Sequence, residues 1–445
     1  MMPPTKKGLY VEMTERKTEI STVKSELLGE EYTLIKHKSG LDIYVVQKNF
    51  SSSYAVFGTR YGSLDNEFRV KGEADIAKVP EGIAHFLEHK MFEMEDGRDA
   101  FELYAETGAD ANAYTGGNRT AYLFSCTREF GHSLRTLLDM VTKPYFTEKT
   151  VKKEQGIIGE EIKMCEDRPG DALHYGLMRA LYEKHPVRIP VAGTVESIAL
   201  ITPELLYRCY NTFYNLHNMV LCICGSVDIE EIISIADEKL ADAPEVEIER
   251  IFPEEKPEAF TERVSCEMQV SKPMFQIGVK DTLPYEGGYR HGETVRNLLC
   301  EAMFGASGEL YSELYEDGLI GGYDSFYYTE RGVSLLSVLG DADDPEAVYG
   351  RFVRYAAKCA EEGVPEEQFI RARRVMYAQI VQSFDSSSDI AEEMFTALVS
   401  GEELFEVANE IYRVKKSELD ELARRLFVPS AYAMSTVYPM KSDEE

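Results

Sequence analysis

This chain of 445 residues lacks several features that would assign it to a common protein class. No stretch is apolar for the roughly 20 residues that a transmembrane helix needs, so we expect no membrane span. The opening segment, MMPPTKKGLYVEMTERKTEI, has no apolar run after its early lysines, which excludes an ordinary secretory signal peptide. We therefore expect a cytoplasmic protein.

Positive charge and paired cysteines are also scarce. The chain has 48 Lys and Arg against 78 Asp and Glu, a formal net charge of -30, and nucleic-acid binding needs a basic surface. We expect no nucleic-acid partner. The eight cysteines lie far apart except Cys222 and Cys224, which share a strand-like run, so neither a disulfide framework nor a Cys-x-x-Cys metal site is indicated. We expect reduced cysteines in the core.

The chain is longer than a single hydrophobic core usually supports, which predicts two domains. The segment 242–263, DAPEVEIERIFPEEKPEAFTER, is rich in proline and glutamate and lacks sustained periodicity, as linkers do. The predicted domains are therefore residues 1–241 and 264–445. In the first, strand-like runs cover 32–47, 53–62, 120–127 and 219–228, and helical runs cover 82–92, 132–142, 146–166, 171–183 and 203–212.

A search for repeats aligns HFLEHKMF, residues 85–92, with NLLCEAMF, residues 297–304. The apolar positions match. The polar positions differ, because the first copy has His85, Glu88 and His89 where the second has Asn297, Cys300 and Glu301.

A second alignment follows in the same order and joins residues 148–162 to residues 366–380. Apolar residues match again, with Val151, Ile157, Ile158 and Ile162 opposite Phe369, Val375, Met376 and Ile380. The two alignments together indicate two domains of one fold, with acidic and imidazole groups gathered in the first domain only.

His85, Glu88 and His89 suggest a metal site. On an α-helix these positions fall within an arc of about 100°, so the three side chains share one face. Two imidazoles one turn apart can bind one ion, and catalytic zinc takes three protein ligands with a fourth position open. His-x-x-Glu-His is the inverted form of the His-Glu-x-x-His zinc motif. The alternative is three polar residues that share a helix face by accident.

The residues around this trio favour the metal site. They are apolar: Ile83, Ala84, Phe86, Leu87, Met91 and Phe92. Unpaired polar groups are costly in such surroundings, so we expect the trio to have a partner.

The third ligand should come from the helix around EQGIIGEEI, where Glu154 and Glu161 lie seven residues apart on one face. We predict Glu161 as the ligand and Glu154, two turns back, as an outer partner that orients a histidine. Glu160 should point into solvent. An ordinary amphipathic surface helix is the alternative. The repeat weighs against it, because Ala372 and Gln379 replace the two acids there.

Four motifs resemble the pitrilysin, insulin-degrading enzyme and mitochondrial-processing-peptidase family of zinc peptidases, and they stand in that family's order along the chain. They are HFLEH, the Glu154–Glu161 spacing, NAYTGGNRTAY at 112–122 and the stretch 213–225. HFLEHKMFE, EDRPGDA and LYEDGLI look typical of the bacterial YmfH-like branch. The resemblance covers essentially the whole chain. It implies an α+β fold of two homologous α/β-sandwich domains, related by pseudo-symmetry, each with a mostly antiparallel sheet and helices on one face.

The resemblance also implies roles for individual residues. Zn²⁺ would be bound by His85, His89 and Glu161, and Glu88 would be the general base for hydrolysis of a peptide. Asn112 and Ala113 would lie on an exposed edge strand, to which a peptide substrate adds as a further strand. From the residues alone, Asn112 could equally be a turn residue before a strand.

The second half departs from the family pattern. Full peptidases have a stretch like LREKRGLAY, whose arginine and tyrosine reach the bound substrate. Here residues 314–323 read LYEDGLIGGY, with Tyr315 at the arginine position, Gly321 at the tyrosine position and Tyr323 nearby. The resemblance therefore implies a zinc-bearing subunit that closes over its substrate with a homologous subunit, as a heterodimer or homodimer. The alternative is a non-catalytic peptide-binding or scaffold subunit with a vestigial zinc site; the intact Glu88 favours the enzyme.

Overall fold

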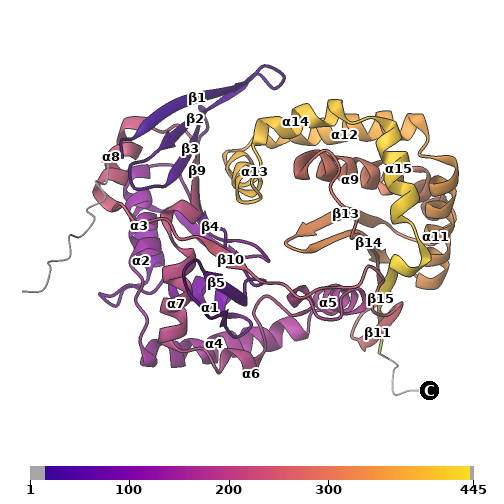
Figure 1. The fold of residues 1–445 in the computed structure, drawn as a ribbon, viewed down its shortest axis with the longest axis horizontal. Coiled ribbons are helices and arrows are strands. Elements are labelled where there is room, and N and C mark those ends of the chain that lie inside the picture. The colour runs from indigo at the N-terminus through magenta and orange to yellow at the C-terminus, as the bar shows by residue number, and fades with distance from the viewer. Residues whose placement is uncertain (1–15, 441–445) are drawn as a thin grey trace, which may run out of the picture.

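The computed structural model describes residues 16–440, so most of the opening segment discussed above and the last five residues lie outside it. The described chain forms two lobes that face each other, the N-terminal half in one and the C-terminal half in the other (Figure 1). None of the helices within residues 16–440 is both long enough and apolar enough to cross a membrane.

The N-terminal lobe is built on a seven-stranded sheet in the order β1-β2-β3-β9-β4-β8-β7, in which only β3 and β9 are parallel. The strands are β1 (Glu19–Ser25), β2 (Glu30–Lys36), β3 (Asp42–Gln47), β4 (Ser53–Thr59), β7 (Asp110–Thr115), β8 (Thr120–Cys126) and β9 (Met219–Gly225). The helices are α1 (Ile83–Lys90), α2 (Ala100–Thr107), α3 (Phe130–Thr142), α4 (Glu148–Glu166), α6 (Val195–Ile198), α7 (Pro203–Phe213) and α8 (Ile229–Lys239). All five predicted helical runs form helices.

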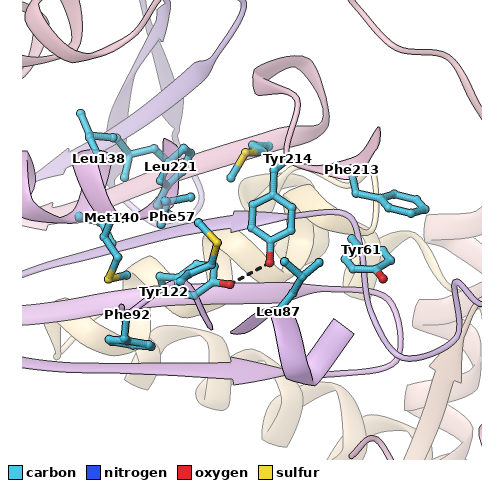
Figure 2. Packing of buried hydrophobic residues seen from close by; sticks show 14 of the residues in the cluster. Phe57, Tyr61, Leu87, Phe92, Tyr122, Leu138, Met140, Phe213, Tyr214 and Leu221 are labelled. Atoms are coloured by element: carbon cyan, nitrogen blue, oxygen red, sulfur yellow. Dashed lines mark hydrogen bonds between the residues drawn. The ribbon is translucent and has the colours of Figure 1, made fainter. Parts of the chain in front are cut away.

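The main core of this lobe lies between one face of the sheet and these helices. Successive strand residues point to opposite faces, so Phe57 of β4 and Tyr122 of β8 point toward the helices. Leu87 of α1 joins them, and the hydroxyls of Tyr122 and Tyr214 are 2.8 Å apart (Figure 2). The inner face of α1 is thereby fixed against the sheet, which orients its polar face.

The C-terminal lobe repeats this arrangement around a five-stranded sheet in the order β11-β15-β12-β14-β13, parallel only between β11 and β15. The strands are β11 (Arg263–Met268), β12 (Met274–Lys280), β13 (Tyr323–Glu330), β14 (Val333–Asp341) and β15 (Tyr432–Pro439). The helices are α9 (Tyr289–Phe304), α10 (Glu309–Glu316), α11 (Pro345–Glu362), α12 (Glu366–Ser383), α14 (Leu404–Arg413) and α15 (Lys416–Leu426). The predicted α+β fold with mostly antiparallel sheets is confirmed.

The two lobes exchange one helix each. Helix α5 (Pro169–Leu181), from the N-terminal half, packs on β12 and β15 of the C-terminal sheet. Helix α13 (Ser387–Val399), from the C-terminal half, packs on β4 and β9 of the N-terminal sheet. Each sheet thus has its own helices on one face and a helix from the other half on the opposite face. The buried apolar residues of α5 and α13 join the lobes.

The aligned repeat segments occupy equivalent helices. Helix α1 packs on α4, and their counterparts α9 and α12 pack on each other. One aligned residue does not behave as expected. Ile158 and Ile162 are buried, but Ile157 is 47% exposed, because it points about 100° away from Ile158 around α4.

The segment 242–263 is more ordered than a free linker. Its residues Ile248–Arg250 form β10, which pairs with β5 (Glu67–Val70), and β6 (Ala77–Lys78) completes this small sheet. The domain boundaries stay a prediction. The expectation of core cysteines is wrong at two positions, since Cys266 is exposed and Cys165 is partly exposed, while all eight cysteines are free.

Candidate metal centre

The polar face of α1 points toward α4. The helix starts after Gly82, whose φ of 85° favours glycine and where a Cβ would lie 2.3 Å from the Ala192 carbonyl oxygen. Ile83, Phe86 and Leu87 are buried in the core. The α1 backbone therefore has little freedom to move.

The rings of His85 and His89 lie side by side, with centroids 4.6 Å apart and planes at 61°. Glu161 of α4 faces both. The His85 Nε2 lies 3.6 Å from Glu161 Oε1, and the His89 Nε2 lies 3.4 Å from Glu161 Oε2. The structure thus brings together the three predicted ligands, and one potential ligand atom from each lies within 4.8 Å of the others.

This geometry fits zinc. Four ligands at 2.0 to 2.1 Å in a tetrahedron are about 3.3 to 3.4 Å from one another, close to the two nitrogen–oxygen distances here. Two imidazoles and a carboxylate are zinc ligands in catalytic sites, and the Glu161 side chain, 37% exposed, leaves the site open to solvent. Within residues 16–440 this is the one group of His, Cys, Asp or Glu with metal-binding spacing.

Glu154 has the position predicted for an outer partner. Its Oε1 lies 3.1 Å from the Nδ1 of His89, which donates to it and leaves Nε2 directed at Glu161. Burial opposes ionisation of Glu154, but the hydrogen bond and charge of His89, with the charges of Lys90 and Lys153, lower its pKa below the usual value. Glu154 therefore stays ionised at neutral pH and fixes the His89 ring.

The pKa values of Glu161 and His89 are also shifted. The imidazole of His85 lowers the pKa of Glu161, and burial only partly opposes this. For His89, burial alone would lower the pKa, but Glu154, Glu88 and Glu161 outweigh it and raise the pKa. The centre concentrates negative charge around two imidazoles, which favours a divalent cation.

Replacing Glu154 by Gln should weaken zinc binding by about 10 to 100-fold, because the His89 ring loses a charged acceptor. Competition with a fluorescent chelator measures this. Glu160→Gln is the matched control, since Glu160 is exposed and forms an ion pair with Lys163 at 2.7 Å, as predicted for a solvated residue. Equal zinc affinity in the two variants would contradict the role of Glu154.

Glu88 is buried, and one of its oxygens has a defined partner. The hydroxyl of Thr115, the last residue of β7, donates to Glu88 Oε2 at 2.6 Å. The sequence did not single out Thr115, although it lies in the motif at 112–122, because only the fold brings it to a glutamate 27 residues earlier. Thr115 restrains the rotation of the Glu88 carboxylate.

Asn112 and Ala113 lie on β7, the outermost strand of the seven-stranded sheet, as the resemblance implied. The N–H of Ala113 donates to the side-chain oxygen of Asn112 at 2.9 Å rather than to β8. The free edge of β7 therefore has one backbone N–H group, that of Ala113, whose acceptor is the side chain of the preceding residue.

Tyr315, Tyr323 and Arg331 of the second half lie in three different environments. Tyr315 is 58% exposed on α10, and Tyr323 is buried with a hydroxyl that lacks a hydrogen-bond partner. Arg331 is held by Asp65, with its Nη1 2.8 and 2.9 Å from the two carboxylate oxygens. At the second copy of the helix pair, Glu301 forms an ion pair with Arg371 at 2.7 Å.

A pocket of about 320 Å³ is lined by residues of α4, α5 and the loop 190–194, and by none of the three candidate zinc ligands. Ile162 and Cys165 of α4 form one wall, directly after Glu161, and Tyr175 of α5 forms another. The loop 190–194 closes it and also packs on Gly82 at the start of α1. The pocket is large enough for an amino-acid side chain.

Comparison with known proteins identifies the family and the fold. The model of the family "Insulinase (Peptidase family M16)" matches residues 77–195, and that of "Peptidase M16 inactive domain" matches residues 200–376. The zinc protease YmfH of Bacillus subtilis (strain 168) is 39% identical over 430 residues, 94% of this chain and 99% of YmfH. The zinc protease YmxG of the same organism is 26% identical over 368 residues, 80% of this chain and 88% of YmxG.

Solved structures show the same fold. An M16-like peptidase from Alicyclobacillus acidocaldarius superposes with a TM-score of 0.86 at 32% identity, over 96% of this chain and 99% of that one. Pitrilysin shares the fold, with a TM-score of 0.73 at 15% identity, over 96% of this chain and 47% of pitrilysin. Similarity at the level of YmfH, over nearly the whole of both chains, places the protein in the insulinase family, peptidase family M16, as a zinc-dependent peptidase.

Proposed function

We propose that the protein hydrolyses oligopeptides or processes small proteins, with His85, His89 and Glu161 as the zinc ligands and Glu88 as the general base. The observation that carries this proposal is the convergence of the three candidate ligands with a buried glutamate restrained by Thr115. Zinc bound there would polarise the scissile carbonyl as a Lewis acid and make water more acidic. Glu88 accepts the proton of the attacking water and passes it to the leaving amine.

The substrate adds to the free edge of β7. An incoming peptide carbonyl replaces the Asn112 side chain as acceptor for the Ala113 N–H, which releases the Asn112 amide to contact the peptide. Because β7 also carries Thr115, the strand that aligns the peptide also holds the general base. Alignment of this kind lowers the entropic part of the barrier.

The pocket that Ile162 lines, one residue after Glu161 in the chain, receives a substrate side chain next to the scissile bond. Ile162, Ala172, Tyr175 and Ala192 give it apolar walls, and charged groups of both signs complete the lining: Glu166, Asp171 and Arg179. Such a lining favours a large apolar side chain over a small one.

A homologous subunit completes the active site. Efficient cleavage needs donors that stabilise the developing negative charge, and the described C-terminal lobe presents an exposed Tyr315 where full peptidases have arginine. A partner with the arginine and tyrosine in its C-terminal half, closing over the zinc lobe, provides these donors. Both a heterodimer and a homodimer are compatible with this role; the sequence departure favours the heterodimer.

The isolated chain should therefore be nearly inactive, and titration with such a homologue should restore hydrolysis of a quenched peptide library. Activity and sedimentation are followed together, and a zinc chelator should abolish the restored activity. Full turnover by the monomeric chain would contradict the need for a partner. Zinc binding without hydrolysis in any combination would instead support the non-catalytic peptide-binding alternative.

A further inference from the structure

Helix α13, which comes from the C-terminal half of the chain, carries one carboxylate that binds two strands of the N-terminal sheet (Figure 1). The hydroxyl of Tyr54, on β4, donates to Glu392 Oε1 at 2.7 Å. The hydroxyl of Tyr114, on β7, donates to Glu392 Oε2, also at 2.7 Å. Nothing in the proposed peptidase mechanism uses these three side chains. The contact joins the edge strand of the candidate active site to the other half of the protein.

Both tyrosine hydroxyls keep their protons at neutral pH. Tyr54 is buried, and Tyr114 is half-buried in the apolar cluster that α13 completes. Burial, together with the Glu392 carboxylate, raises the pKa of each hydroxyl, and the charge of Arg119 opposes this at Tyr114 without reversing it. Each hydroxyl is therefore a donor to a carboxylate oxygen, and hydrogen bonds of this kind are stronger than those between neutral groups.

Helix α13 is a firm support for Glu392. Phe395 packs so closely on β4 that a Cβ at Gly58 would lie 2.3 Å from its Cζ atom. Arg60, directly after β4, donates from Nη2 to the Leu398 carbonyl near the C-terminal end of the helix, at 3.0 Å. The buried apolar residues of α13 pack on this face of the sheet. Close packing of this kind leaves Glu392 little freedom to move relative to the central strands.

Strand β7 depends on contacts outside its own sheet. It is the outermost strand, and within residues 16–440 it pairs only with β8, so its position is set largely by the contacts of its two faces. Successive residues alternate between these faces. Ala113 and Thr115 lie on the side of α1, and Tyr114 lies on the side of α13. The hydrogen bond from Tyr114 to Glu392 therefore restrains β7 from the face opposite α1.

Tyr114 also lies between the two residues of β7 that the proposed mechanism uses. The preceding residue, Ala113, has the N–H group that a peptide carbonyl would bind, and the following residue, Thr115, donates to Glu88 at 2.6 Å. A shift of β7 would move both groups, and a misplacement of about 1 Å can lower a rate by about 10²-fold. Restraint of Tyr114 thus restrains both the substrate edge and the orientation of Glu88.

We propose that Glu392 is a positioning residue for peptide hydrolysis: through Tyr114 it holds β7, and hence the Glu88 carboxylate, in the reactive geometry. The inference rests on the proposed function, because it takes β7 as the substrate strand and Glu88 as the general base. It adds a role for the C-terminal half of the same chain, whose helix α13 supplies the carboxylate.

Two matched variants test the proposal, since each removes one hydroxyl that donates to Glu392 at 2.7 Å. Tyr114→Phe releases β7, whereas Tyr54→Phe leaves the bond between Glu392 and β7 intact. In the assembly with the complementing subunit, Tyr114→Phe should lower kcat by about 10-fold with its zinc content unchanged. Tyr54→Phe should leave kcat near that of the wild type. Equal kcat in the two variants would overturn the proposal, because a purely structural contact would affect both alike.

Two substitutions of Glu392 add a rescue. Glu392→Ala removes both acceptors, so kcat should fall as it does in Tyr114→Phe. Glutamine has nearly the same shape as glutamate, and its amide oxygen can accept from one hydroxyl while its amide N–H donates to the other. Glu392→Gln should therefore recover most of the lost kcat. An equal loss in Glu392→Ala and Glu392→Gln would contradict a role through these hydrogen bonds.

Hydrogen exchange measures the restraint on β7 without relying on activity. The amides of residues 110–115 should exchange about 10-fold faster in Tyr114→Phe and Glu392→Ala than in the wild type or Tyr54→Phe. Unchanged exchange would overturn the proposal whether or not the assembly is active. Faster exchange with no hydrolysis by the wild-type assembly would instead refute the proposed function, and with it the role of Glu392 in catalysis. The melting temperature of each variant verifies that it is folded.

Discussion

Glu88→Gln should retain about one zinc ion per chain and lose peptide hydrolysis by a factor of about 10² to 10⁴, the usual contribution of a general base. In the unmodified chain the Thr115 hydroxyl donates to Glu88 at 2.6 Å. The amide oxygen of glutamine can accept the same hydrogen bond, so the local structure should be preserved. Glutamine does not take up a proton from water at neutral pH. The measurement is kcat/KM in the presence of the complementing subunit, together with elemental analysis.

The controls are the candidate ligands themselves. His85→Ala and Glu161→Gln should lose most of the zinc, because each removes one of three groups that lie 3.4 to 3.6 Å from a neighbouring ligand atom. Full zinc occupancy in both would refute the ligand assignment. Equal zinc loss in Glu88→Gln and His85→Ala would refute the separation between ligand and base.

The parts of the site that follow from local periodicity could be predicted from the sequence. Residues four apart on a helix meet on one face, which placed His85 and His89 together, and the seven-residue spacing did the same for Glu154 and Glu161. That α1 and α4 face each other did not follow from spacing alone. The absence of the two acids in the second repeat indicated that Glu154 and Glu161 belong to the site of α1. The contacts between His89 and both glutamates agree with this prediction.

The parts that depend on long-range packing could not be predicted. Apolar periodicity indicates that α5 and α13 each bury one face, but not that each covers the sheet of the other half. Thr115 meets Glu88 only through the position of β7 beside α1. Asp65 and Arg331 are 266 residues apart and carry no motif.

Asp65→Ala should destabilise the protein more than any loss of a surface ion pair. The Asp65 side chain is fully buried, and it accepts from Arg250 Nε at 2.9 Å, from Arg331 Nη1 at 2.8 Å and from the N–H of Gly62 at 3.0 Å. Its removal leaves two guanidinium groups without their carboxylate, and breaking a buried pair in this way costs about 3 to 5 kcal/mol. The thermal unfolding midpoint should fall by several degrees.

Glu249→Ala is the matched control, because it removes an arginine–carboxylate pair in the same region whose partners are 37% and 58% exposed. Exposed pairs contribute about 0 to 1 kcal/mol, so its midpoint should change little. The turn that contains Asp65 also binds the β7–β8 turn, through the N–H groups of Ser63 and Leu64 and the carbonyls of Gly116 and Gly117, each at 3.0 Å. Asp65→Ala should therefore also loosen Thr115 and reduce kcat below the unfolding temperature, whereas Glu249→Ala should not. Equal midpoints and equal kcat in the two variants would show that Asp65 does not hold the lobes and the active-site strand together.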